Sequence, residues 1–168
     1  MKLVTWNVNS LKVRLPQVLQ WLEMNPVDVV CIQETKLTED KFPQAEIEAA
    51  GYHVVFTSQK TYNGVAIVSR HPIDAVQKNN PLFEDEQQRI IAATIAGMRI
   101  ICAYVPNGQA LDSEKYPYKL SWLAALRDWV KAEMEQHPQL ALLGDYNIAP
   151  DDRDVHDPAA WEGMNLVS

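Results

Sequence analysis

The stretch ALLGDYNIAPDDRDVHD, residues 141–157, joins an apolar run to a strongly acidic segment. The apolar run predicts a buried strand over Leu140–Leu143, and five aspartates follow between Asp145 and Asp157. A carboxylate delivered by a buried strand costs free energy unless a partner or a cation uses its charge. Asp145 follows Gly144, so it either opens a turn or serves a site at the end of the strand. We expect most of the run from Asp151 to Asp157 to be a solvated loop.

Similar apolar runs recur along the chain and predict a layered fold with many strands. Strands are predicted at Leu3–Val8, Val27–Gln33, Tyr52–Thr57, Gly64–Ser69, Ile90–Ile95, Arg99–Val105 and Leu140–Leu143. Helices are predicted at about Leu15–Met24 (with Pro16 in the opening turn), Gln44–Ala50 and Lys115–Gln136, and a hairpin turn at Ala96-Gly97-Met98. Helices interposed between some strands indicate an α/β or α+β fold. A length of 168 residues, with no linker or repeat, predicts one domain over 1–168.

Polar side chains stand at the ends of four predicted strands. LVTWN ends on Asn7, VDVVCIQE ends on Glu34, IICAY ends on Tyr104, and LALLGDYN delivers Asp145 and Asn147. If these ends converge, the two carboxylates offer the hard oxygen ligands that Mg²⁺ prefers, and the phenol can donate to a phosphoryl oxygen. Such a set suits attack of an activated water on a phosphodiester.

Each of these residues also has a simpler interpretation. Glu34 can be an exposed carboxylate at a strand end, Asp145 a turn residue, and Tyr104 a core tyrosine whose hydroxyl is satisfied. Asn7 fits such an interpretation least well, because a buried asparagine needs hydrogen-bond partners.

Composition restricts the class of protein. Cys31 and Cys102 lie in apolar strands and are expected to be reduced, buried thiols, and no two of the four histidines have zinc-ligand spacing. The formal charge of −7 argues weakly against a nonspecific nucleic-acid coat and fits a metal enzyme better. The opening MKLVTWNVNS lacks the long apolar core of a signal peptide, and no run is long enough to cross a membrane. We therefore expect a cytoplasmic protein with no membrane contact.

Six ordered motifs carry a resemblance to a known family. TWNVNSLKVRL, IQETKL, NGVAIVSRHP, YVPNG, LLGDYNIAP and DVHDPAAW resemble the exodeoxyribonuclease III family of apurinic/apyrimidinic endonucleases, within the endonuclease/exonuclease/phosphatase superfamily. GDxN alone is a weak signal, but six motifs in order over residues 1–168 are specific. The resemblance implies a four-layered α/β sandwich of two mixed β-sheets flanked by helices.

The resemblance also implies roles for single residues. Glu34 would ligate Mg²⁺ (with Mn²⁺ as a substitute), with Asn7 beside it and Lys36 close to the glutamate. Asp145 would position or deprotonate the attacking water. The other implied assignments are Tyr104, Asn107 and Asn147 at the scissile phosphate, and Asn9, Tyr62 and Arg70 as DNA contacts or supports of the site.

The implied reaction is Mg²⁺-dependent hydrolysis of DNA. It comprises incision 5′ to abasic sites, leaving a 3′ hydroxyl, and 3′-to-5′ exonuclease action on duplex ends. The implied partner is double-stranded DNA, with no obligate protein partner. Two other readings stay open at this point: another phosphoesterase of the superfamily, acting on a phosphoinositide or sphingomyelin, and a noncatalytic remnant.

The sequence departs from the family after DVHDPAAW. Family members run on and later supply another acidic residue and a Ser-Asp-His motif, so this chain is expected to be the N-terminal part of the domain. From this we expect missing strands in the second sheet, unpaired strand edges and impaired catalysis.

Overall fold

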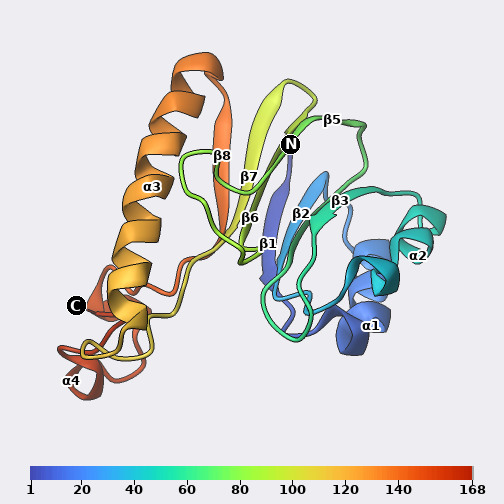
Figure 1. Cartoon of the computed structure of the whole chain (residues 1–168). Helices are drawn as coiled ribbons and strands as arrows, with labels where there is room; N and C mark the ends of the chain where they lie inside the picture. The colour runs from blue at the N-terminus through green and yellow to red at the C-terminus, as the bar shows by residue number, and fades with distance from the viewer. Residues whose placement is uncertain (168) are drawn as a thin grey trace.

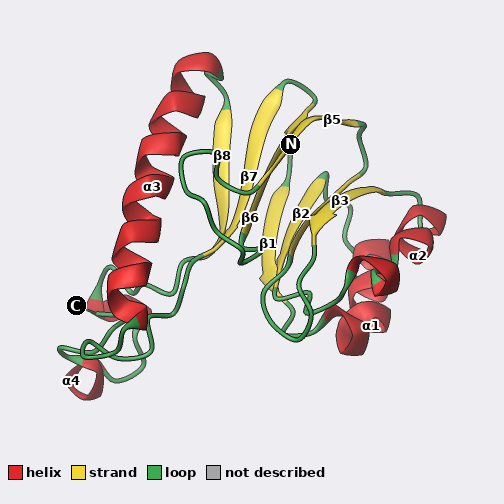
Figure 2. Ribbon diagram, in the orientation of Figure 1, coloured by secondary structure: helices red, strands yellow, loops and turns green. Residues whose placement is uncertain are grey.

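The computed structural model describes residues 1–167. It is a sandwich of four layers, in which two mixed sheets face each other and helices cover both outer faces (Figure 1). The fold class and the layer order predicted from the sequence are confirmed. Figure 2 shows the helices Leu11–Met24 and Gln44–Ala49 on one side of the sandwich and the helix Lys115–Gln136 on the opposite side.

The first sheet has the strand order β1-β2-β4-β3. Its strands are β1 (Leu3–Asn7), β2 (Val29–Gln33), β3 (His53–Thr57) and β4 (Val65–Ser69). The strands β1 and β2 are parallel, whereas β4 is antiparallel to both β2 and β3. Every residue of β2 and β4 is buried, because these central strands are covered on both faces. The parallel pair β1 and β2 ends at one edge of the sandwich, and that edge carries Asn7.

The second sheet has the order β5-β6-β7-β8. Its strands are β5 (Ile73–Lys78), β6 (Ile90–Ile95), β7 (Met98–Tyr104) and β8 (Leu140–Asp145). Strands β6 and β7 form the predicted hairpin, in which Ala96 and Gly97 both have positive φ, as a two-residue turn of this kind requires. The last pair is parallel, with Tyr104 opposite Asp145, so β7 and β8 end together.

The outer helices each bury an apolar stripe. Helix α1 spans Leu11–Met24 and α2 spans Gln44–Ala49, both over the first sheet, while α3 spans Lys115–Gln136 over the second. Short helical segments complete the chain: η1 (Glu39–Lys41), η2 (Asp152–Asp154) and α4 (Pro158–Trp161). The layer between the sheets is a third apolar cluster, and it contains both cysteines. No helix in residues 1–167 is long and apolar enough to cross a membrane.

Helix α1 begins four residues earlier than predicted, which places Pro16 inside the helix instead of in its opening turn. The backbone amides of Ser10 and Leu11 donate to the carbonyls of Glu34 and Thr35, and Leu11 is fully buried. These contacts anchor an additional turn to the segment after β2. Tertiary contacts thus outweigh the cost of an internal proline.

Strand β5 was not predicted. Most of its residues are exposed, and its pairing with β6 shifts between Asp74 and Gln77, so the sequence shows no clean alternation. Strand β8 runs two residues beyond the predicted end, to Asp145. In the part of the chain that the structure describes, β1 and β3 are the outer strands of the first sheet and β5 and β8 those of the second, and β1 lies close to β8. The expectation that strands are missing from the second sheet stays a prediction.

Candidate active site

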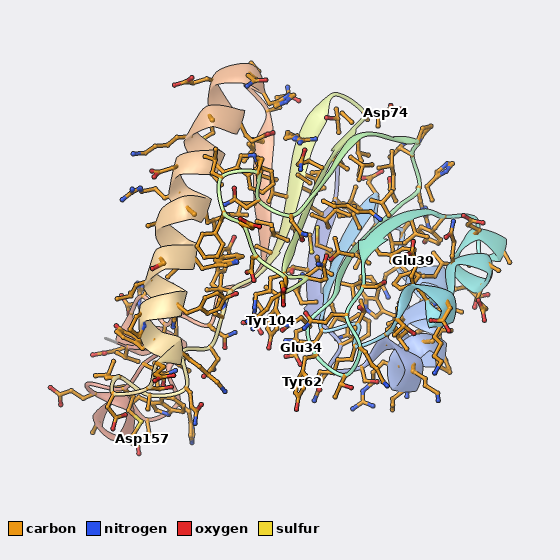
Figure 3. All side chains as sticks on the ribbon, in the orientation of Figure 1. Glu34, Glu39, Tyr62, Asp74, Tyr104 and Asp157 are labelled. Carbon is orange, nitrogen blue, oxygen red and sulfur yellow. The ribbon has the colours of Figure 1, made fainter. Side chains whose placement is uncertain are left out.

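The ends of β1, β2, β7 and β8 meet at one end of the sandwich. Figure 3 shows Glu34 and Tyr104 there, with Tyr62 nearby, whereas Asp74 lies at the opposite end. The topology explains this convergence, because β1 and β2 are parallel, β7 and β8 are parallel, and β1 lies beside β8. Residues far apart in the sequence therefore share one small polar site.

The Asn7 carboxamide joins the two sheets at this site. Its Nδ2 donates to Glu34 Oε1 at 2.8 Å and to Asp145 Oδ2 at 2.8 Å. Its Oδ1 accepts from the backbone N–H of Asn9 at 3.0 Å, which fixes the orientation of the amide. Two carboxylate oxygens that contact one nitrogen cannot be farther apart than the sum of the two contacts. Glu34 and Asp145 are thus held as a close pair by a neutral side chain.

Glu34 accepts hydrogen bonds from three side chains. Lys36 Nζ lies 2.7 Å from Glu34 Oε2 and also donates to Asn9 Oδ1 at 2.6 Å. Burial opposes ionisation of Glu34, but the hydrogen bonds from Asn7, Lys36 and Tyr104 outweigh it and lower the pKa of the Glu34 carboxyl. The residue is therefore an anion at neutral pH.

Tyr104 is a protonated hydrogen-bond donor at neutral pH. Burial and the hydrogen bond to Glu34 raise the pKa of its phenol to about 12. The Arg89 guanidinium lies 4.9 Å from the centroid of the Tyr104 ring, and the two residues also exchange backbone contacts. The ring is held on one face by a cation while its hydroxyl points to the carboxylate.

Asp145 and two asparagines form the other half of the site. Asp145 Oδ1 accepts from the backbone N–H of Asn147 at 3.1 Å. The Asn147 side chain donates to Val105 O at 2.9 Å and accepts from Asn107 Nδ2 at 3.1 Å. Each carboxamide keeps a further N–H, since an NH₂ group has two donors.

Backbone strain gathers in the segments that carry these groups. Asn9, Glu34, Lys36 and Asn147 all have φ between 43° and 56°, a region that residues other than glycine rarely adopt. Gly144 is required for a different reason, because a Cβ there would lie 1.9 Å from Ala103 O. Strain of this kind is commonly stored at functional sites.

Comparison with known proteins identifies the family. The model of the endonuclease/exonuclease/phosphatase family matches residues 4–166. The chain belongs to this family.

Three relatives illustrate the similarity. An exodeoxyribonuclease III of Haemophilus influenzae is 32% identical over 161 residues, which are 92% of this chain and 60% of that protein. A solved structure of a 3′ phosphatase from Neisseria, bound to a product DNA hairpin, is 53% identical with a TM-score of 0.95, over 98% of this chain and 64% of that chain. An AP endonuclease from Archaeoglobus fulgidus is 40% identical with a TM-score of 0.92, over 97% of this chain and 64% of that chain. The chain therefore spans about 60–64% of the length of these relatives.

The donor set suits a hard divalent cation, as in a family of metal-dependent enzymes. Glu34 and Asp145 present two neighbouring carboxylates, and Mg²⁺ is commonly held by one or two carboxylates together with waters and phosphate oxygens. Within residues 1–167 no group of three or more His, Cys, Asp or Glu side chains is arranged to hold a metal. Asn7 presents its nitrogen, not its oxygen, to the two carboxylates and so bridges them, and its place beside a metal stays a prediction.

The structure brings nine of the ten predicted site residues to this end of the sandwich. Asn9 contacts Lys36, and Tyr62 lines a cavity together with Asn107. Arg70 is the exception, because it follows Ser69, which pairs with Val29 at the opposite end of β2. Its guanidinium lies over the Tyr52 ring and contacts the Tyr52 hydroxyl. The prediction that Arg70 supports the site is wrong, because β4 runs antiparallel to β2 and carries Arg70 away.

Three polar residues near the site were missed. Arg89 packs on Tyr104, and Lys119 and Asn165 contact the loops that carry Asn107 and Asn147. Arg89 stands just before a predicted strand and could have been singled out with the other strand-end groups. Lys119 lies among polar and apolar residues of a helix, and Asn165 lies outside the recognised motifs, so neither gave a signal.

Proposed function

We propose that this chain carries the hydrolytic site of a Mg²⁺-dependent phosphodiesterase acting on double-stranded DNA. The reactions would be incision 5′ to abasic sites and removal of nucleotides from 3′ ends. The observation that supports this most is the Asn7 amide, which holds Glu34 and Asp145 together 2.8 Å from a single nitrogen. Family membership favours this reading, and the relatives described above are named as an exodeoxyribonuclease, a 3′ phosphatase and an AP endonuclease.

The proposed roles follow from charge and hydrogen bonding. Glu34 holds the cation, and Mg²⁺ when bound offsets charge on the phosphate and on the leaving oxygen. Asp145 orients a water and accepts its proton as the new P–O bond forms and the bond from phosphorus to the 3′ oxygen breaks. Tyr104 would donate the hydrogen bond of its hydroxyl to a phosphoryl oxygen in place of Glu34 when substrate is bound, which its protonated state at neutral pH allows.

The DNA backbone is proposed to lie beside Asn107. A cavity of about 650 Å³ opens there, and its lining includes Arg89, Lys115 and Tyr62. The Arg89 and Lys115 cations attract phosphates locally, on a chain whose net charge is −7. Substrate binding by this chain would therefore depend on a few positioned cations and would weaken as salt increases.

Catalysis by the 168-residue chain alone is proposed to be slow. The family resemblance implies a further acidic residue and a histidine beyond this span, and each preorganised group contributes on the order of 10²–10³ in rate. Of the histidines here, His71 pairs with Asp28 and His137 lies near Glu133, both away from Glu34. A cytoplasmic location remains a prediction from the sequence.

Single-turnover cleavage of a fluorescent duplex tests the proposal. The protein is used in excess over a duplex with one abasic site, with Mg²⁺ or with a chelator, and a 3′-recessed duplex and a phosphoinositide serve as alternative substrates. We expect slow cleavage 5′ to the abasic site that requires Mg²⁺, and no release of lipid phosphate.

Two matched aspartate variants sharpen this experiment. Asp145→Asn should abolish the Mg²⁺-dependent cleavage, whereas Asp28→Asn, which alters a carboxylate at the opposite end of β2, should leave it unchanged. Cleavage that survives chelation, or that is equal in both variants, would contradict the proposal.

A further inference from the structure

The side chain of Lys119, in the second turn of α3, is almost completely buried. Only 2% of the residue is exposed, although lysine is rarely buried unless it is paired with an anion. In residues 1–167 Lys119 has no salt bridge to a carboxylate. Burial lowers the pKa of its ammonium, which shows that the site costs free energy. Such a group needs other compensation.

Backbone carbonyls provide that compensation. Lys119 Nζ lies 2.7 Å from Asn147 O, 2.9 Å from Asn165 O and 3.4 Å from Asn107 O. An ammonium has three donors, so the three acceptors match its hydrogen-bonding capacity. The acceptors belong to three segments: the loop after β7, the loop after β8 and the segment after α4.

The same three asparagines are linked to one another. Asn165 Nδ2 donates to Asn107 O at 2.7 Å and lies 3.2 Å from Asn107 Oδ1, and Asn107 Nδ2 donates to Asn147 Oδ1 at 3.1 Å. Gly108 passes directly over the lysine, because a Cβ at Gly108 would lie 3.0 Å from Lys119 Cδ. The ammonium is therefore the centre of a compact group, here called the asparagine cluster (Asn107, Asn147 and Asn165 around Lys119).

We propose that Lys119 is a positioning residue, which fixes the backbones of Asn107 and Asn147 so that their carboxamides face the scissile phosphate. This inference rests on the proposed function for the role of those two carboxamides. Lys119 would not touch the substrate, since its three donors are occupied by the protein. Asn165, another residue of the asparagine cluster, donates to Asn107 and so connects the segment after α4 to the loop that carries Asn107. That segment thereby becomes part of the proposed site.

The charge of Lys119 bears on the proposed phosphate site. Among residues 1–167 no carboxylate forms an ion pair with Lys119, so its positive charge remains uncompensated behind the Asn107 and Asn147 carboxamides, which are proposed to meet a phosphate. Without the ammonium, the carbonyl oxygens of Asn147 and Asn165 would lose this donor, while Asn107 O would keep the hydrogen bond from Asn165 Nδ2, and the loops would separate. Misplacement of catalytic groups by about 1 Å can reduce a rate on the order of 100-fold.

Side-chain amide signals in ¹⁵N NMR spectra of the free protein test the positioning directly. In Lys119→Met we expect the Nδ2 signals of Asn107 and Asn147 to move toward those of exposed asparagines, while the Asn7 signal, which belongs to the site but not to the asparagine cluster, stays in place. Lys131→Met, an exposed lysine of the same helix, should change none of the three signals. Unchanged Asn107 and Asn147 signals, or an equal change at Asn7, would overturn the inference. This measurement needs no DNA, so its failure is distinct from a failure of the proposed function.

Kinetics supply the second readout. With abasic duplex, Lys119→Met should lower the single-turnover rate at saturating protein at least about tenfold, with the half-saturating concentration changed much less, since a positioning residue acts on the chemical step. A variant that weakened binding alone would overturn the inference.

Asn165→Ala carries the test if Lys119→Met does not fold. It removes only the two contacts to Asn107 and leaves the ammonium in place. We expect the Asn107 signal to move and the rate to fall about tenfold. An unchanged Asn107 signal would count against the asparagine cluster as a positioning device.

Discussion

Two buried cations stand at opposite ends of the layer between α3 and the second sheet, and they are satisfied in opposite ways. Arg99, in the second position of β7, forms an ion pair with Glu133 on α3 at 2.5 Å and also donates to Ala75 O at 2.7 Å. Lys119, near the other end of α3, instead donates to three backbone carbonyls, and within residues 1–167 it has no carboxylate partner. The ion pair neutralises its own charge, whereas the lysine keeps its charge next to the proposed phosphate site.

We expect the Arg99 ion pair to contribute to stability and the end of the molecule that holds Lys119 to contribute to function. A neutralised pair can hold α3 on the sheet without exerting a field elsewhere, and Trp129 Nε1 also donates to Glu133 at 3.1 Å to complete it. The end of the molecule that holds Lys119 also holds the carboxylates Glu34 and Asp145, which both contact Asn7. We expect changes at the Arg99 end to alter the free energy of unfolding, and changes at the Asn7 end to alter the rate.

The largest effect is expected from breaking the Arg99 ion pair. Glu133→Ala leaves a buried guanidinium without its anion, which should lower the free energy of unfolding by about 3–5 kcal/mol. Urea unfolding followed by circular dichroism measures this, with the exposed Glu135→Ala as a control. A loss equal to that of the control would show that the two ends do not differ as described.

The next effect concerns the Asn7 end. Tyr104→Phe removes one donor from the proposed phosphate site and should lower the single-turnover rate on abasic duplex by on the order of 10²–10³, with little change in unfolding free energy. Tyr52→Phe is the matched control, because the Tyr52 hydroxyl donates to Leu22 O at the far end of the molecule. A similar rate loss in both variants would contradict the assignment of Tyr104.

A smaller effect is expected at Gly144, where one substitution should lower both the stability and the rate. Gly144→Ala places a Cβ against Ala103 O, so β8 must shift away from β7 and carry Asp145 with it. Overpacking of this kind should cost about 1–3 kcal/mol of stability, and the displaced carboxylate should also lower the rate. Gly97→Ala is the comparison for backbone strain without a clash, because a Cβ there meets nothing within 4 Å but the φ of +81° is unfavourable for alanine; it should lower the stability and leave the rate unchanged. An unchanged rate in Gly144→Ala would contradict the close approach of β7 and β8.

The smallest effect is a pH dependence from Glu34. The folded state lowers the pKa of this carboxyl below its ordinary value of 4.5, so its contribution to stability is present above that value and is lost as pH falls through the folded pKa. Unfolding free energies measured from pH 6 down to about pH 3 should fall more steeply for the natural chain than for Glu34→Gln. Parallel curves for the two proteins would remove Glu34 from the groups that set acid stability.

Most of the fold follows from local patterns, and the exceptions have identifiable causes. Continuous apolar runs predicted β2, β4, β6 and β7, since strands buried on both faces need such runs. Strand β5 escaped detection because its exposed residues and its bulge remove the alternation. The additional turn of α1 depends on carbonyls of Glu34 and Thr35, which no local pattern contains.

The residues of the site also divide into those that local sequence patterns predicted and those that they did not. Polar residues at the ends of apolar strands were recognisable, and Asn7, Glu34, Tyr104 and Asp145 were found on that basis. Lys119 could not be found, because a lysine in a helix is normally exposed and its burial depends on three distant loops. Arg70 was misplaced because a motif shared along one strand does not say which end of that strand faces the site.

The pair of thiols between the sheets has a practical consequence. Cys31 on β2 and Cys102 on β7 are fully buried, and a hydrogen bond between them together with burial raises the pKa of the Cys31 thiol well above its usual range. Alkylating reagents attack thiolates, so Cys31 is protected by burial and by its raised pKa, and Cys102 is protected by burial. The rate at which a maleimide labels the native chain therefore reports how often the two halves of the sandwich come apart, with no engineered probe.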